Sequence, residues 1–420
     1  MCQTPGVGGS KGDARLRAAS VVTIAVIVLN LTTYGFTILA AHRLGPAEYG
    51  AVAALMGLLL VLNVLGLGLQ TTAARRVSQA GAERTVRIHE TLSVTSRLSP
   101  VLGLCCLVAA PLVQHVFHLA SPLTAPFVAV TAWLQALTLG QAGVLQGERR
   151  WTPLALLYAA TGVARLVGGV LGMAWRDDAL GAMTGVALGA VVPVLVGWCA
   201  LRKRARPPLP TGHRREILTE LAHNSHALIA FLALSNADII VARIALAAHP
   251  AGWYAGGLIL TKAVLFLPQF VIVLAFPTLA SGGSQRRASM RLGLLLVSFL
   301  GVAVVIGTAV LRRLALVFIG GDDYATIKPV LWQFALLGTA LALLQVLVYD
   351  LVAGQDHRPV AVLWLGVAAI AAAAPIVHST DALLHWVVAV DILATAMLAW
   401  LSARPRASSA PSPPTRPAER

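Results

Sequence analysis

The sequence predicts an all-α membrane protein with about twelve transmembrane helices, and three observations lead there. Hydrophobic residues make up 57% of the 420 positions, charged residues make up only 12%, and the mean hydropathy is +0.78. A soluble domain carries roughly 25% charged residues, so this chain has too little polar surface to face water all round. Apolar runs of about 20 residues, enough to cross the hydrocarbon of a bilayer, recur between short connectors.

The apolar runs divide the chain into spans that are bounded by charged residues or by Pro and Gly. The predicted spans are 18–41, 49–71, 92–117, 122–145, 152–174, 179–201, 224–247, 251–279, 290–311, 328–353, 359–377 and 383–402. The first run exceeds the 7–15 residues or so of a secretory signal, so we expect it to be a retained span.

Basic residues in the connectors set the orientation of these spans. With a cytoplasmic N-terminus, 24 Arg and Lys residues fall in cytoplasmic segments and five in external connectors. Cytoplasmic loops carry such an excess in membrane proteins, so we expect both termini to be cytoplasmic. The formal net charge of +15 therefore reflects topology and contact with anionic membrane lipids, and it does not indicate nucleic-acid binding.

Two related halves are expected. The predicted segments are a cytoplasmic N-terminus (1–17), an N-terminal six-helix bundle (18–201), a basic cytoplasmic linker (202–223), a C-terminal six-helix bundle (224–402) and a disordered cytoplasmic tail (403–420). Pro46, Ala47 and Tyr49 after the first span correspond to Pro250, Ala251 and Tyr254 after the seventh. An even number of spans in each half predicts parallel repeats that are related by an axis along the membrane normal.

Charged residues inside spans are the candidates for substrate or cavity residues, because a central charge costs about 2.5–3.5 kcal/mol on insertion scales. They are Arg165, Asp238, Arg243, Lys262 and Asp391. Such residues usually face a cavity or one another.

Asp238 and Lys262 are equally distant in sequence from Pro250, at the turn between the seventh and eighth spans. Both are expected about 18 Å below the outer surface, where an ion pair would keep their charges in the bilayer. The pair could be purely structural or could take part in substrate binding or ion coupling. Arg165, at a similar depth, suits an anionic group such as pyrophosphate, although it could instead contact a local carbonyl.

Proline and glycine mark other features of the spans. Pro193, Pro268 and Pro277 are candidates for helix breaks, which line cavities in transporters but are also tolerated as plain kinks. Gly168 and Gly172 in the fifth span, with Gly181, Gly185 and Gly189 in the sixth, predict close helix packing.

Several kinds of chemistry are not indicated. The sequence has no phosphate-binding loop of the ATPase type and no HExxH or GxSxG motif. Cysteine spacing does not predict a zinc site. We therefore expect no cofactor, no metal site and no enzymatic activity; an integral glycosyltransferase would need an acidic site, which only Asp322 and Asp323 offer.

The segment "HRLGPAEYGAVAAL" (42–55) resembles the bacterial polysaccharide biosynthesis, or oligosaccharide flippase, family of the multidrug/oligosaccharidyl-lipid/polysaccharide exporter superfamily. The second half is similar in having an Asp in the seventh span and a Lys followed by Leu-Pro in the eighth; the stretch "LVFIGGDDYATIKPVL" (316–331) also resembles the family. The resemblance implies two six-helix bundles that form a V around a central cavity and alternate access by rocking. It carries over only Asp238, Lys262 and Pro268.

The resemblance implies a flippase for a lipid-linked oligosaccharide or polysaccharide precursor in the bacterial inner membrane. Expected partners are the lipid-linked glycan, Na+ or H+ as a coupling ion, membrane lipids and glycosyltransferases of the same pathway. Two alternatives remain open: a cation-coupled exporter of drugs or metabolites, and a membrane scaffold that does not transport.

Overall fold

A computed structural model describes residues 9–202, 226–265, 284–354 and 360–403, and within these ranges the chain is helical with no strand. The helices are α1 (Gly9–Gln79), α2 (Arg84–Val116), α3 (Thr124–Gly147), α4 (Trp151–Trp175), α5 (Ala179–Gly189), α6 (Val191–Leu201), α8 (His226–Ala245), α9 (Ala248–Val264), α11 (Ser284–Val310), α12 (Arg312–Ile319), α13 (Leu331–Gly354), α14 (Val360–Ala372) and α15 (Thr380–Ala403); two 3₁₀ helices are η1 (Gly81–Glu83) and η3 (Gly321–Val330).

Each predicted span has a counterpart among these helices. Eight helices of the described chain are long and apolar enough to cross a membrane, and one of them, Ser20–Gln79, contains the first two predicted spans. Helix α9 is described to Val264 only, and α14 ends at Ala372, before the predicted end of its span. The predicted linker and the C-terminal tail lie outside the described residues except for Arg202 and Ala403. Pro268 and Pro277 also lie outside them.

Two of the helical segments are broken at a glycine or near a proline. In α1, Gly45 has φ 66° and ψ 174°, and Pro46 follows it. Glycine tolerates this left-handed backbone and proline starts a new helix readily, so the first two spans meet here. The sixth predicted span is broken at Ala190 into α5 and α6, three residues before Pro193. Proline has no N–H for the carbonyl of Gly189, which explains the break.

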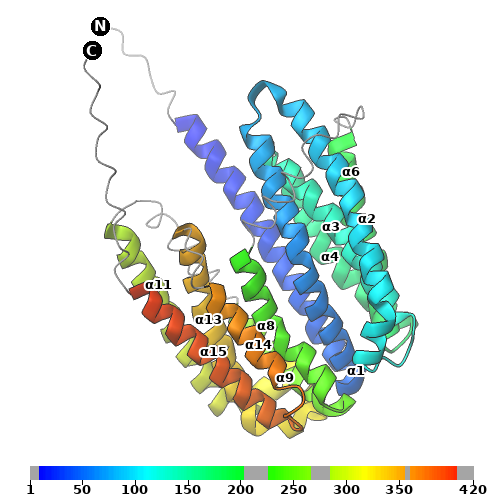
Figure 1. Cartoon of the computed structure of the whole chain (residues 1–420), viewed down its shortest axis with the longest axis vertical. Helices are drawn as coiled ribbons and strands as arrows, with labels where there is room; N and C mark the ends of the chain where they lie inside the picture. Colours follow the sequence, from blue (N-terminus) through cyan, green and yellow to red (C-terminus); the bar gives the residue numbers. More distant parts are fainter. Residues whose placement is uncertain (1–8, 203–225, 266–283, 355–359, 404–420) are drawn as a thin grey trace, which may run out of the picture.

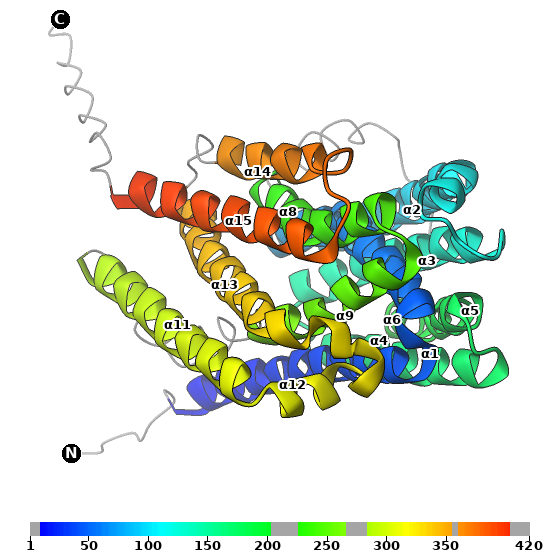
Figure 2. The ribbon, with the colours of Figure 1, turned by 90° about the horizontal axis from the view of Figure 1, so that it is seen from below.

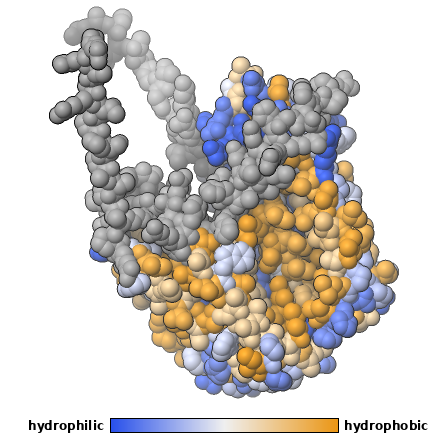
Figure 3. Space-filling model, in the orientation of Figure 1, coloured by the Kyte–Doolittle hydropathy of each residue, from blue (hydrophilic) through white to orange (hydrophobic). Residues whose placement is uncertain are grey.

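The helices form two lobes arranged as a V (Figures 1 and 2). The first lobe is α1–α6 and the second is α8–α15. The lobes meet at the end that contains the Gly45 turn and the α8–α9 turn, and they diverge toward the end where α1 begins and α15 ends (Figure 1). A broad apolar surface lies between hydrophilic residues at both ends (Figure 3). The protein is therefore a multi-pass α-helical membrane protein.

Helices α4 and α5 pack backbone against backbone through the predicted glycine face. A Cβ added at Gly172 would lie 2.1 Å from the carbonyl oxygen of Gly181, and one at Gly185 would lie 2.0 Å from that of Gly168. No side chain fits at this distance. Small residues let helix backbones approach closely and gain van der Waals contact in a membrane, so the glycines have a structural role here.

We predict that Gly172→Ala lowers the free energy of unfolding by about 1–3 kcal/mol, because the methyl group forces α4 and α5 apart. The measurement is a thermal unfolding curve of the purified protein in detergent. Gly307→Ala is the matched control, since nothing lies within 4 Å of a Cβ at Gly307 in α11. Equal unfolding temperatures for the two variants would contradict this account of the packing.

Candidate functional site: a central cavity with two basic residues

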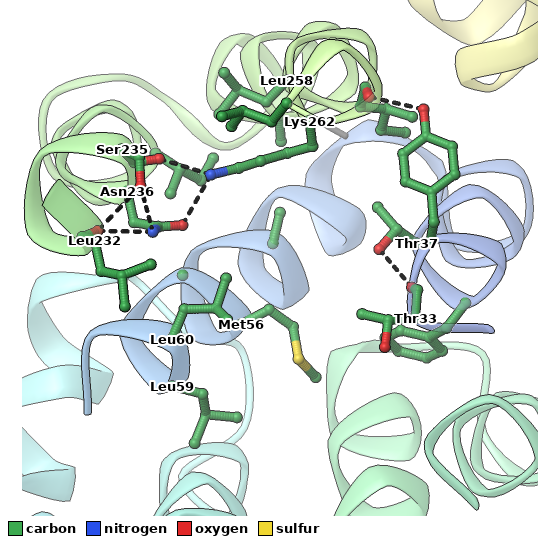
Figure 4. Close-up of a pocket in the computed structure, with 18 of the residues that line it drawn as sticks. Thr33, Thr37, Met56, Leu59, Leu60, Leu232, Ser235, Asn236, Leu258 and Lys262 are labelled. Carbon is green, nitrogen blue, oxygen red and sulfur yellow. Dashed lines mark hydrogen bonds between the residues drawn. The ribbon is translucent and has the colours of Figure 1, made fainter. Parts of the chain in front are cut away.

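A central cavity of about 340 Å³ lies between the two lobes. Its walls come from both halves of α1, from α8 and α9, from Arg165 of α4 and from Gln345 of α13. Leucine, methionine and phenylalanine side chains share the lining with amides and hydroxyls: Asn30, Thr33, Thr37, Asn63, Ser235 and Asn236 (Figure 4). The cavity therefore offers both apolar surface and hydrogen-bonding groups to a ligand.

Lys262 reaches from α9 across to α8 (Figure 4). Its Nζ donates to the carbonyl oxygen of Ser235 at 2.6 Å and to Oδ1 of Asn236 at 3.1 Å. The amide nitrogen of Asn236 donates in turn to the carbonyl of Leu232 at 2.8 Å. These bonds fix the amide orientation and hold the ammonium group at the cavity wall.

The predicted ion pair between Asp238 and Lys262 is wrong. Asp238 accepts hydrogen bonds from its neighbour, the backbone N–H of Ile239, at 2.7 Å and from the Tyr254 hydroxyl at 3.4 Å. Residue spacing along α8 and α9 correctly placed the two charges at one depth, but it does not determine rotation about the helix axis. The face of α8 that meets Lys262 carries Ser235 and Asn236, and Asp238 points to Tyr254.

Asp238 and Asp391 are buried behind the cavity wall, with exposed fractions of 2% and 1%. Asp391 lies in α15, within electrostatic range of Asp238 and Lys262, and its Oδ1 has no hydrogen-bond partner among the described residues. Neither aspartate is among the described residues that line the cavity. Among the described residues, Lys262 is the cation within electrostatic range of both carboxylates.

Arg165 of α4 lies at the cavity wall. It lines both the central cavity and a second cavity of about 300 Å³, whose described walls come mainly from the first lobe and also include Leu232 of α8. Asn30, Thr33, Asn63 and Leu232 also line both, so the two cavities share a wall region. The structure gives Arg165 no hydrogen bond or ion pair with a described residue, and its guanidinium donors are available to a ligand. Pro193 lines the second cavity.

Arg243 is not among the described residues that line either cavity. Its Nε donates to the carbonyl oxygen of Phe117 at 2.7 Å, and its Nη atoms donate to the carbonyls of His118 at 3.3 Å and Ala47 at 3.5 Å. The charge is satisfied by three main-chain carbonyls of the first lobe. Arg243 is near the end of α8 and therefore lies at the closed end of the V, where the two lobes meet.

The two cavities have one sign of charge. Arg165 and Lys262 line them, and no Asp or Glu is among the described lining residues. The amides Asn30, Asn63 and Asn236 are the site residues that sequence reasoning missed. Each of these amides interrupts an apolar run of the sequence. A buried amide needs a hydrogen-bond partner, as a buried charge does, but an amide in an apolar run indicates a site less strongly than a charge.

The family model for polysaccharide biosynthesis proteins matches residues 16–282. The chain belongs to this family. The resemblance seen in the sequence is thereby confirmed. Among functionally curated proteins none matches the sequence.

Solved structures of low sequence identity share the fold. One is a multidrug resistance MATE family transporter of the MOP superfamily in an inward-facing conformation: TM-score 0.67, 14% identity, 90% of this chain and 97% of that chain covered. Another is the lipid II flippase MurJ in an inward closed conformation: TM-score 0.70, 10% identity, 91% and 87% covered. A third is a MOP superfamily transporter from Pyrococcus furiosus: TM-score 0.57, 15% identity, 91% and 94% covered.

We predict that Lys262→Met lowers the free energy of unfolding by about 1.5–3 kcal/mol, because it removes the charged donor of two hydrogen bonds and the cation within electrostatic range of Asp238 and Asp391. The double variant Lys262→Met with Asp391→Asn should recover part of this loss, since it removes one of the uncompensated charges. Thermal unfolding of the two single variants and the double variant gives the coupling energy between the sites. Strictly additive effects would show that Lys262 does not stabilise the acidic pair.

Proposed function

We propose that the protein is a flippase that moves an anionic lipid-linked oligosaccharide or polysaccharide precursor across the bacterial inner membrane. The observation that carries the proposal is the cavity between the lobes, whose described lining contains Arg165 and Lys262 and no acidic residue. A pyrophosphate group is recognised by charge-assisted hydrogen bonds from such cations, and sugar hydroxyls match the amides and hydroxyls beside them. The apolar part of the wall suits the start of a lipid chain.

Family membership and fold support this proposal. The family is that of polysaccharide biosynthesis proteins, and one structural neighbour is a lipid II flippase. The excess of basic residues in alternate connectors supports cytoplasmic termini, so the structure corresponds to a state that is closed on the outside. Glycosyltransferases that build the lipid-linked precursor are the partners that this function requires.

The charge of the cavity also argues against one form of the main alternative, a cation-coupled exporter whose drugs or metabolites are themselves cations. An exporter of cationic drugs would place Arg165 and Lys262 against its own substrate, and like charges in a low-dielectric cavity repel. A scaffold without transport activity would not need an arginine with free donors at the interface of two lobes.

Coupling to Na+ or H+ is the second part of the proposal. Its support is the buried pair Asp238 and Asp391, of which Asp391 has an unpartnered oxygen. A cation bound near these groups would compete with Lys262 for their charge. A Na+ or H+ gradient is therefore expected to accelerate transport, and Asp391→Asn is expected to remove that acceleration.

We predict that Arg165→Gln slows flipping at least about tenfold, because a hydrogen bond to a charged group is worth about 1.5–3 kcal/mol. The assay uses proteoliposomes with a fluorescent polyprenyl-pyrophosphate oligosaccharide, whose outer-leaflet fraction is measured by quenching with dithionite. Arg176→Gln is the control, since Arg176 is exposed and pairs only with Asp178 among the described residues.

Three results would contradict the proposal. One is wild-type protein that does not flip the labelled lipid. Another is export of the cation ethidium without any movement of the lipid-linked glycan. The third is an Arg165→Gln variant that is folded and flips at the wild-type rate.

A further inference from the structure

The two lobes touch directly where the repeat-related turns meet. The turn within α1 at Gly45–Pro46 and the start of α9 face each other, and Gly252 lies against the backbone of the first lobe. A Cβ at Gly252 would lie 1.8 Å from the carbonyl oxygen of Pro46, and one at Gly50 would lie 2.9 Å from Cα of Gly252. The closed end therefore has no room for any side chain at Gly252.

Arg243 binds across the same contact. It is 5% exposed and donates to carbonyls at two places in the first lobe: Phe117 and His118 after α2, and Ala47 in α1. The carbonyls at the C-terminal end of α2 carry the negative end of its helix dipole. One arginine thus ties the end of α8 to two separate segments of the opposite lobe.

The remaining bonds at this end are weaker and uncharged. The Tyr324 hydroxyl donates to the carbonyl of Ala41 at 3.3 Å, and a ring nitrogen of His42 lies 3.0 Å from the carbonyl of Val317. Arg243 makes no ion pair with a described residue. Every acceptor that Arg243 uses is a main-chain carbonyl, which water can solvate once the lobes part. Opening this end therefore breaks no ion pair among the described residues, although it takes Arg243 away from Glu48 of α1, which lies within electrostatic range.

We propose that Gly252 and Arg243 form the outer gate of the transporter and set its balance between closed and open states. Gly252 permits closure because only hydrogen fits against Pro46, and Arg243 holds the closed state through three carbonyls. Replacing Gly252 by a larger residue, or Arg243 by a residue without a guanidinium group, shifts the protein toward the state that is open at this end. The inference rests on the proposed function only in taking the lobes to rock against each other.

The experiment measures two distances between the lobes by double electron–electron resonance in lipid nanodiscs. All four native cysteines are replaced by serine. One spin-label pair, Leu123→Cys with Asp381→Cys, reports on the closed end; the other, Ala82→Cys with Arg291→Cys, reports on the opposite end. All four positions are exposed, and Thr380, beside Asp381, donates to the carbonyl of Pro250.

For Arg243→Gln we expect the ratio of long to short distances at the closed end to rise at least about tenfold, given the strength of hydrogen bonds from a charged donor. For Gly252→Ala we expect the same direction of change, because the added methyl group overlaps the carbonyl oxygen of Pro46 when the lobes touch. The distance at the opposite end should shorten in the same samples. Arg243→Lys should give a smaller change, because an ammonium group cannot reproduce the planar fork of arginine.

The matched controls are Gly307→Ala, where a Cβ meets nothing within 4 Å, and Arg312→Gln. Among the described residues the guanidinium of Arg312 bonds the carbonyl of Ala309, which belongs to its own lobe. Folded Gly252→Ala and Arg243→Gln proteins with the wild-type distances would overturn the proposal. A longer distance at the closed end with no change at the opposite end would also overturn it, because that result indicates local loosening and not rocking of the lobes. The distance measurement uses no substrate, so it tests the gate separately from the proposed function. If the distances shift as expected but the protein does not flip lipid-linked glycan, the proposed substrate is refuted and the gate proposal is kept.

Discussion

The cost of placing an ionic side chain in hydrocarbon governs how this molecule is built. Each such group costs several kcal/mol unless it is solvated or paired, and the chain meets this constraint in three ways. Lys262 binds a carbonyl and an amide on the neighbouring helix. Arg243 binds three carbonyls of the opposite lobe. Arg165 has no such partner among the described residues, and its charge is accommodated because it borders two cavities.

These three solutions divide the interface between the lobes into regions with different roles. Arg243 and Gly252 lie where the lobes touch. Their partners are backbone atoms, which can form hydrogen bonds with water once the contact opens. Lys262 and Arg165 lie where the lobes separate, so a ligand can reach them. The buried carboxylates of Asp238 and Asp391 lie behind Lys262, and their charge holds that lysine in place. Closing one end and binding an anion are thus separate tasks of separate residues.

Much of the fold could be predicted from the sequence because hydropathy and charge act along the chain axis. The helical class of the chain and the glycine face of α4 and α5 are features of this kind, and the structure confirms them. The depth of Asp238 and Lys262 was likewise a matter of counting residues from Pro250. What counting cannot supply is rotation about the helix axis, and for that reason the Asp238–Lys262 ion pair was wrong.

The positions of Arg243 and Gly252 were beyond sequence reasoning for a related cause. The partners of Arg243 are carbonyls, which every residue has, so no pattern of side chains indicates them. Gly252 lies against Pro46, a residue more than 200 positions away in the chain, and only the packing of two lobes brings them together. The cavity amides were detectable in principle, since an amide in an apolar run needs a partner or water.

The central claim is that Arg165 and Lys262 give an accessible cavity a positive potential. It is tested by placing a single cysteine at Thr33, which lines both cavities, in a background without native cysteines. Its reaction rates with an anionic and a cationic methanethiosulfonate reagent are then compared in membrane vesicles. The account predicts faster reaction with the anionic reagent and a clear loss of that preference in Arg165→Gln. Equal rates with both reagents, or no reaction with either, would contradict it.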